Sequence, residues 1–172
     1  KIMEHLLAAL TRPNRLALEL SMSTGLRISD CLSIRSKDLG KVLYVKEAKT
    51  SKNRRIFVKK AILDELKEIA GENFVFEHRL DPKKHRTRQA VYKDLKRACK
   101  LFRLPKELNI TSHTARKIYA VKRWNGKRAP KYMTDILGHS SEPVAMLYTM
   151  ADLITLRQHP ELKNYILNST MR

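Results

Sequence analysis

The sequence has little of what marks a disulfide-rich, metal-binding or membrane-spanning protein. Its two cysteines, Cys31 and Cys99, lie far apart and form no Cys-x-x-Cys pattern. None of its six histidines stands at a metal-ligand spacing such as His-Glu-x-x-His. The longest apolar runs, such as residues 6–10, fall far short of the roughly 20 residues that a membrane span requires. We therefore expect two reduced cysteines, no metal, no cofactor and no membrane.

Acidic residues are also scarce relative to basic ones. Lys and Arg number 36 against 17 Asp and Glu, which gives a formal net charge of +19. The basic charge is spread over residues 46–60, 83–103 and 116–131 instead of lying on one amphipathic helix. This distribution favours nucleic acid over an anionic membrane as the partner. A highly charged soluble surface without such a partner is the alternative.

Length and composition predict one globular domain over residues 1–172. A chain of 172 residues that is 42% hydrophobic can bury a substantial core. The first ten residues lack a basic segment, an apolar segment and a small-residue cleavage site in succession. We expect a protein of the cytoplasm. Because the chain does not begin with Met, we also expect it to be part of a longer protein.

Hydrophobic periodicity predicts helices in the first half of the chain, separated by a small sheet. Leu6, Leu7 and Leu10 share a helical face, Thr11 begins a second helix, and Gly25 ends it. Further expected elements are a short helix capped by Ser29, strands at 42–45 and 55–58 joined by a hairpin connection at 49–53, a helix at 62–69 that stops at Gly71, and a third short strand at 74–76.

The second half is predicted to be helical. Helices are expected at 91–102, from Thr111 or Ser112 to about Asn125, from Pro130 to Gly138 and from Pro143 through Tyr148. Two short helices, beginning at Asp152 and Glu161, would follow. The predicted fold class is mostly α with a small antiparallel β-sheet, an α+β domain.

Two basic segments of the first half are candidates for phosphate chemistry. The run Thr-Gly-Leu-Arg-Ile-Ser-Asp at residues 24–30 places Arg27 just after a helix-ending glycine. The hairpin run Lys-Thr-Ser-Lys-Asn-Arg-Arg begins at Lys49, and its Lys52 and Arg54 are candidate DNA contacts. Each segment alone is also compatible with solvated surface charge, and for the hairpin local composition favours a solvated turn.

Two further segments carry a histidine each. His113 and Arg116 lie three positions apart, so a helix would place both on one face, where they can donate hydrogen bonds to one phosphate. Leu-Gly-His ends at His139, and Tyr148 follows nine residues later. A helix-cap histidine beside an exposed arginine, and a core tyrosine, are the ordinary alternatives for these residues.

Taken together and in order, these four segments resemble the tyrosine recombinase (phage integrase) family. The family pattern is an Arg in a Gly-Leu-Arg turn, a Lys in a β-hairpin, a His-x-x-Arg pair, a Leu-Gly-His element and a Tyr nine residues later. The matching residues are Arg27, Lys49, His113, Arg116, His139 and Tyr148. Lys46 and Lys52 compete with Lys49, and Asp30 stands where the family often has Glu.

The resemblance implies a catalytic-domain fold and a strand-exchange reaction on double-stranded DNA without metal or ATP. Tyr148 would form a covalent 3′-phosphotyrosyl link. Arg27, Arg116 and His139 would bind the scissile phosphate, while His113 would take the tyrosine proton and Lys49 would protonate the leaving oxygen. The family also implies a separate N-terminal core-binding domain, absent from these 172 residues, and a homo-tetramer on DNA.

Several points stay open at the level of sequence. Residues 151–172 form a tail that packs either on a neighbouring protomer or on its own core. Integration and excision of a phage or mobile element is the expected role. A type IB topoisomerase-like enzyme that relaxes supercoils, and a DNA-binding module without catalysis, are the rival functions.

Overall fold

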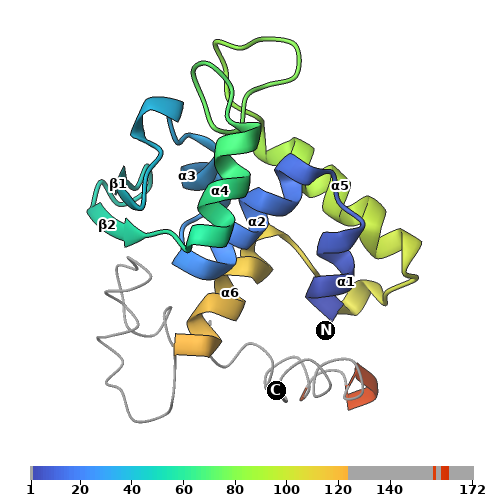
Figure 1. Cartoon of the computed structure of the whole chain (residues 1–172). Coiled ribbons are helices and arrows are strands. Elements are labelled where there is room, and N and C mark those ends of the chain that lie inside the picture. The colour runs from blue at the N-terminus through green and yellow to red at the C-terminus, as the bar shows by residue number, and fades with distance from the viewer. Residues whose placement is uncertain (1, 124–156, 158–159, 163–172) are drawn as a thin grey trace.

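The computed structural model describes residues 2–123, 157 and 160–162, and within them the chain is mostly helical (Figure 1). The helices are α1 (Ile2–Ala8), α2 (Arg12–Thr24), α3 (Ile28–Leu32), α4 (Lys60–Ile69), α5 (Arg88–Leu101) and α6 (Ser112–Arg123). Short 3₁₀ turns are η1 (Ser36–Asp38), η2 (Lys106–Leu108) and η3 (Pro160–Leu162). The predicted α+β class is confirmed.

The sheet is a single antiparallel hairpin of β1 (Val42–Lys46) and β2 (Asn53–Phe57). Its register pairs Leu43 with Ile56, and both side chains are buried against the helices. The opposite face is open, and Tyr44 and Phe57 are exposed there. This alternation is the period-2 pattern of a strand pair with one face on the core.

Helix α2 lies at the centre of the described fold, and α1, α3, α4, α5 and α6 all pack against it. Its Leu16, Leu18 and Leu20 are fully buried, so it presents apolar side chains to more than one neighbour. The core around it includes fully buried side chains from most of the other elements: Leu6, Leu26, Leu32, Leu66 and Leu95. Both α3 and α6, which carry site residues, are thus fixed against one rigid helix.

Two local predictions are wrong. Residues 74–76 form no strand: Phe74 makes one isolated bridge with Arg35, and Val75 N–H donates to the Ile34 carbonyl oxygen at 3.0 Å. All three residues are buried in the core, and their apolar character reflects that burial. Ser29 does not cap α3. The helix begins at Ile28, so Ser29 lies within it and Arg27 occupies the N-cap position.

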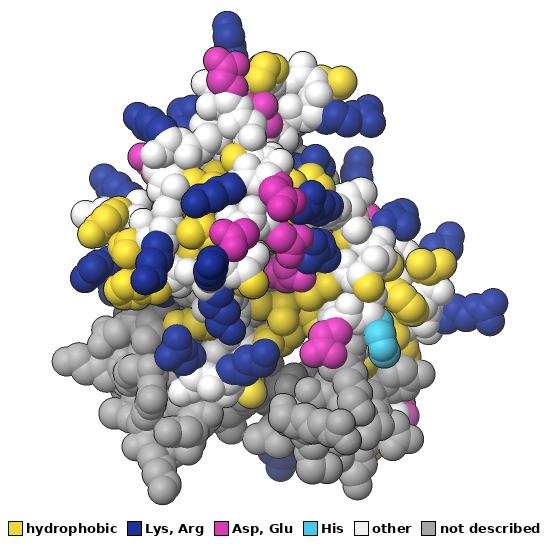
Figure 2. Space-filling view, in the orientation of Figure 1, with side chains coloured by type: hydrophobic (Ala, Val, Ile, Leu, Met, Phe, Trp, Pro, Cys, Tyr) yellow, Lys and Arg dark blue, Asp and Glu magenta, His cyan; other side chains and the backbone are white. Residues whose placement is uncertain are grey.

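Surface charge follows the composition. Lys and Arg side chains are spread over the face in Figure 2, including the region of the β1–β2 hairpin. Acidic side chains gather near the middle of that face. On α4, Glu65 pairs with Arg15 of α2, and Glu68 pairs with Arg12 of the same helix. No helix within the described residues has the length and apolarity to cross a membrane.

Candidate active site

Arg27 is positioned by a tight turn between α2 and α3. Gly25 ends α2 in the left-handed conformation, with φ 72° and ψ 9°, and its N–H donates to the Ser21 carbonyl oxygen. A Cβ at this position would lie 2.5 Å from ring atoms of Tyr119 on α6. Two constraints therefore require glycine at position 25: the left-handed backbone conformation and the close approach of α6.

Buried hydroxyl groups stabilise the same turn. Ser21 Oγ donates to the Leu26 carbonyl oxygen at 2.7 Å, and Thr24 Oγ1 donates to the Leu20 carbonyl oxygen at 2.6 Å. Leu26, which is fully buried, anchors the turn in the core. These contacts fix the backbone from which the Arg27 side chain extends.

Arg116 joins the turn from α6. Its side chain is 1% exposed, and Nη1 donates to the Gly25 carbonyl oxygen at 2.8 Å. The contact links residues 91 positions apart in the sequence. The two arginines that the sequence pattern pairs are thus brought to one place by the packing of α6 against α2.

A buried carboxylate, Glu47, lies among these arginines. Arg27 Nη1 is 2.6 Å from Glu47 Oε2, Arg54 Nη1 is 3.0 Å from Oε1, and Arg116 Nη1 is 4.0 Å from Oε1. Thr50 Oγ1 donates to Oε2 at 2.9 Å. Burial opposes ionisation of Glu47, but the hydrogen bonds from Arg54, Thr50 and Arg27 outweigh it and lower its pKa below the ordinary value.

A second acid, Asp30, supports the hairpin from α3. Its Oδ1 accepts a hydrogen bond from the Ala48 N–H at 3.1 Å, and the residue is 2% exposed. Burial raises the pKa of Asp30, with the nearby charge of Glu47 acting in the same direction. The acid that follows the Arg27 turn therefore contacts the hairpin backbone and makes no hydrogen bond to Arg27.

The predicted catalytic lysine, its two competitors and the predicted DNA contacts of the hairpin have different environments. Lys46, Lys49 and Lys52 are exposed, so the structure leaves all three available to a ligand. Arg54 instead lies inward, where Nη2 donates to the Thr24 carbonyl oxygen at 3.1 Å. A phosphate contact by Arg54 would take place beside Arg27 and not at the hairpin tip.

His113 lies in the first turn of α6 and is exposed. A cavity beside it is lined by Arg88, Gln89, Tyr92, Thr111, Ser112 and His113. Partial desolvation and then the positive charges of Arg116 and Arg88 lower the pKa of His113 below the ordinary histidine value of 6.5. At neutral pH the imidazole is therefore mostly neutral and can accept a proton.

Glu47 was not among the predicted site residues, although strand periodicity indicates that it faces the core. Residues 43, 45 and 47 fall on one face of an extended segment, and the first two, Leu43 and Val45, are apolar residues packed in or against the core. Arg54 shares the buried face of β2 with Ile56 for the same reason.

His139 and Tyr148 lie outside the described residues. No group of three or more His, Cys, Asp or Glu suited to a metal occurs in the described part of the chain.

Comparison with known proteins identifies the family. The model of the phage integrase family matches residues 1–153. The chain belongs to the phage integrase family. No curated protein matches it. The family match spans every residue of the sequence pattern, from Arg27 to Tyr148.

Solved structures of recombinases share the fold. The integrase of transposon Tn1549 in complex with a circular-intermediate DNA has 21% identity and a TM-score of 0.66 over 85% of this chain and 58% of its own. A lambda integrase dimer bound to a core site has 24% identity and a TM-score of 0.69 over 86% and 56%. The XerH site-specific recombinase bound to a palindromic difH substrate has 20% identity and a TM-score of 0.67 over 91% and 51%.

These similarities confirm the predicted tyrosine recombinase catalytic-domain fold. The chain spans between about half and three fifths of the length of these structures. The similarity to these structures therefore shows the fold of this domain and not the partners of the longer proteins.

Proposed function

We propose that this chain is the catalytic domain of a site-specific DNA recombinase that cuts and rejoins double-stranded DNA through a covalent 3′-phosphotyrosyl intermediate. The observation that carries the proposal is the meeting of Arg27 and Arg116 on one turn, through the Arg116–Gly25 hydrogen bond of 2.8 Å. Two guanidinium groups placed together suit the non-bridging oxygens of a phosphodiester, where negative charge grows during the reaction.

The proposed chemistry assigns one role to each residue of the pattern. The Tyr148 oxygen attacks the scissile phosphorus, a P–O bond to tyrosine forms, and the P–O5′ bond breaks. Arg27 and Arg116, with His139, bind the phosphate oxygens. His113 takes the phenol proton, a role that its lowered pKa supports.

A proton is also required by the departing 5′ oxygen, and Lys49 is the proposed donor. Lys49 precedes Thr50, whose hydroxyl is bound to Glu47, so its backbone is tied to the arginine cluster although its side chain is exposed. The phosphotyrosyl bond conserves the energy of the cleaved bond. A second DNA strand can then reverse the reaction without ATP.

The biological context follows from the same proposal. Three recombinases that share the fold are bound to DNA: a circular-intermediate DNA, a core site and a palindromic difH substrate. We propose double-stranded attachment sites as the substrate, integration or excision of a phage or mobile element as the role, and the cytoplasm as the location. The assembly would be a homo-tetramer on DNA, with residues 151–172 as a tail of the 1–172 domain.

The test is covalent trapping on nicked DNA. A library of nicked duplexes with a randomised core is incubated with the protein, and protein–DNA adducts are isolated under denaturing conditions. The short fragment released by cleavage diffuses away and leaves the adduct trapped. Sequencing of the trapped DNA then gives the target site.

Matched variants decide the outcome. The Tyr148→Phe protein should bind the trapped site but form no adduct, whereas Tyr44→Phe, at a tyrosine that is 77% exposed on β1, should form it normally. Absence of an adduct with the unaltered protein would favour a DNA-binding module without catalysis. Relaxation of supercoiled DNA without exchange between two duplexes would favour the topoisomerase-like function.

A further inference from the structure

Glu47 is a buried carboxylate to which the proposed reaction assigns no role. Its side chain is 0% exposed, and it follows directly after the last residue of β1. Burying a charged carboxylate costs free energy unless the charge is paired and hydrogen-bonded. Here it is both, through Arg27, Arg54 and Thr50. A fold that requires only an apolar core would have no need of this arrangement.

The contacts of Glu47 connect three separate parts of the candidate site. Arg27 comes from the turn after α2, Arg54 from β2, and Thr50 from the hairpin connection that also carries Lys49. Arg54 in turn reaches the Thr24 carbonyl oxygen at 3.1 Å, on the same turn as Arg27. Through one carboxylate, the hairpin and the arginine turn are therefore held as a unit.

We propose that Glu47 is a positioning residue for phosphodiester cleavage, which orients Arg27 and Arg54 toward the scissile phosphate and fixes the Lys49 hairpin against them. The inference rests on the proposed function. Glu47 itself does not contact DNA in this proposal. It acts through the guanidinium groups that it holds.

Electrostatics explains why such a residue is useful. Arg27, Arg54 and Arg116 each place a terminal nitrogen within 4.0 Å of Glu47. Positive charges gathered around one carboxylate repel one another when no phosphate is present. The carboxylate offsets that repulsion in the DNA-free protein. Arg27 uses only Nη1 toward Glu47, and its other N–H groups suit a phosphate. A guanidinium that is already oriented needs less reorganisation when the transition state forms.

The ionisation state of Glu47 is consistent with this role. Burial opposes its charge, but the hydrogen bonds from Arg54, Thr50 and Arg27 outweigh that effect and keep its pKa below the usual range. The residue is thus ionised at neutral pH.

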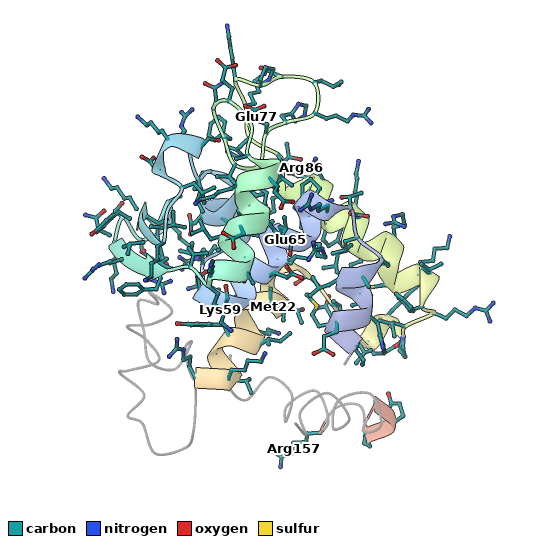
Figure 3. The ribbon with its side chains drawn as sticks, viewed as in Figure 1. Met22, Lys59, Glu65, Glu77, Arg86 and Arg157 are labelled. Carbon is teal, nitrogen blue, oxygen red and sulfur yellow. The ribbon has the colours of Figure 1, made fainter. Side chains whose placement is uncertain are left out.

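The test compares three carboxylate variants in single-turnover cleavage of the nicked DNA site selected above. Glu47→Gln keeps the shape and removes the charge, and we expect adduct formation at saturating DNA to slow at least tenfold. Glu47→Asp keeps the charge but shortens its reach, and we expect a two- to fivefold loss. Glu65→Gln is the matched control, because Glu65 pairs with Arg15 between α4 and α2, apart from the hairpin (Figure 3). Its rate should equal that of the unaltered protein.

Two further readouts separate positioning from a general loss of folding. Each variant is assayed at a temperature where circular dichroism shows it folded, and DNA affinity is measured alongside the rate. Positioning predicts a slower rate with an affinity changed less than threefold. In an Arg27→Lys background, Glu47→Gln should cost less than half of its effect in the unaltered protein, since residues that act through one another are not additive.

The outcomes are distinguishable from those of the proposed function. If the unaltered protein forms no adduct, both the function and this inference fail. If it forms the adduct and Glu47→Gln cleaves at the same rate, only the inference about Glu47 is overturned. Equal effects of Glu47→Gln with Arg27 and with Lys at position 27 would likewise overturn it.

Discussion

Arg116 Nη1 donates to the carbonyl oxygen of Gly25 at 2.8 Å, and by this bond the helix that carries one predicted catalytic arginine holds the turn that presents the other. The bond is buried, because the Arg116 side chain is 1% exposed. Arg116 therefore has a structural role in addition to its proposed catalytic one. A substitution at this position should change both stability and cleavage, and stability can be measured without DNA.

Arg116→Met should destabilise the protein. Methionine fills a similar volume but leaves the Gly25 carbonyl oxygen without its donor, which costs about 1–3 kcal/mol for a buried acceptor. The free energy of unfolding, measured by urea denaturation, should fall by that amount. Lys117→Met is the control, because Lys117 is exposed on the same helix and should change stability by less than about 0.5 kcal/mol. Equal stabilities of the two variants would contradict the role of the bond.

Gly25→Ala should destabilise the same turn by a different route. An L-residue at φ 72° costs about 1–2 kcal/mol, and the added Cβ would also meet the Tyr119 ring at 2.5 Å. Gly40→Ala is the matched control, since a Cβ there meets only the Val42 carbonyl oxygen at an ordinary 3.7 Å. Thermal and urea unfolding should therefore separate the two alanine variants. A Gly25→Ala protein as stable as Gly40→Ala would show that the turn adapts freely.

Much of the fold could be predicted from local sequence rules. Helix α2 begins after Thr11 and ends at Gly25, as the spacing of Leu16 and Leu20 with a following glycine predicts. The β1–β2 hairpin also follows from two short apolar runs around a basic connection. These elements depend on patterns of a few residues, which the sequence displays directly.

Other features depended on contacts between distant segments. Phe74 and Phe76 fill the core beside the segment around Arg35. Three apolar residues in a row are typical both of a short buried strand and of a buried loop, so their pattern does not distinguish the two. Glu47 resembles a surface acid in a basic hairpin until the turn 20 residues earlier places Arg27 against it. In the candidate site, Arg27, Arg54 and Arg116 could be predicted from sequence motifs, whereas Glu47, which lies among them, could not.

The electrostatic environment of His113 leads to a prediction about its titration. Desolvation and the charges of Arg116 and Arg88 lower its pKa, so removing one of those charges should raise it. In Arg88→Gln the pKa of His113, followed by the NMR shift of its Cε1 proton, should move up toward the ordinary value. Lys93→Gln, an exposed change on the same helix α5, should leave it in place.

The same shift has a consequence for stability. Because the pKa of His113 is lower in the folded than in the unfolded protein, folding excludes a proton. The contribution of His113 to stability is therefore fully present above the unfolded value near 6.5 and is lost as the pH falls through the folded pKa. Relative to His113→Gln, the unaltered protein should lose stability between neutral and mildly acidic pH. Parallel pH profiles of the two proteins would contradict this.

The identity of the proton donor can be decided among Lys46, Lys49 and Lys52, all of which are exposed in the hairpin. A general acid matters only when the leaving group needs a proton. If the 5′ bridging oxygen of the nicked substrate is replaced by sulfur, the group leaves as a thiolate, whose conjugate acid has a pKa of about 8.5. We expect Lys49→Ala to cleave the oxygen substrate at least 100-fold more slowly than the unaltered protein, in the range of general acid catalysis. It should cleave the sulfur substrate at nearly the normal rate. Lys46→Ala and Lys52→Ala are the controls, and each should lower the cleavage rates of the oxygen and sulfur substrates equally or bind DNA more weakly. If the sulfur substrate restored a normal cleavage rate in either control, that lysine would be the proton donor.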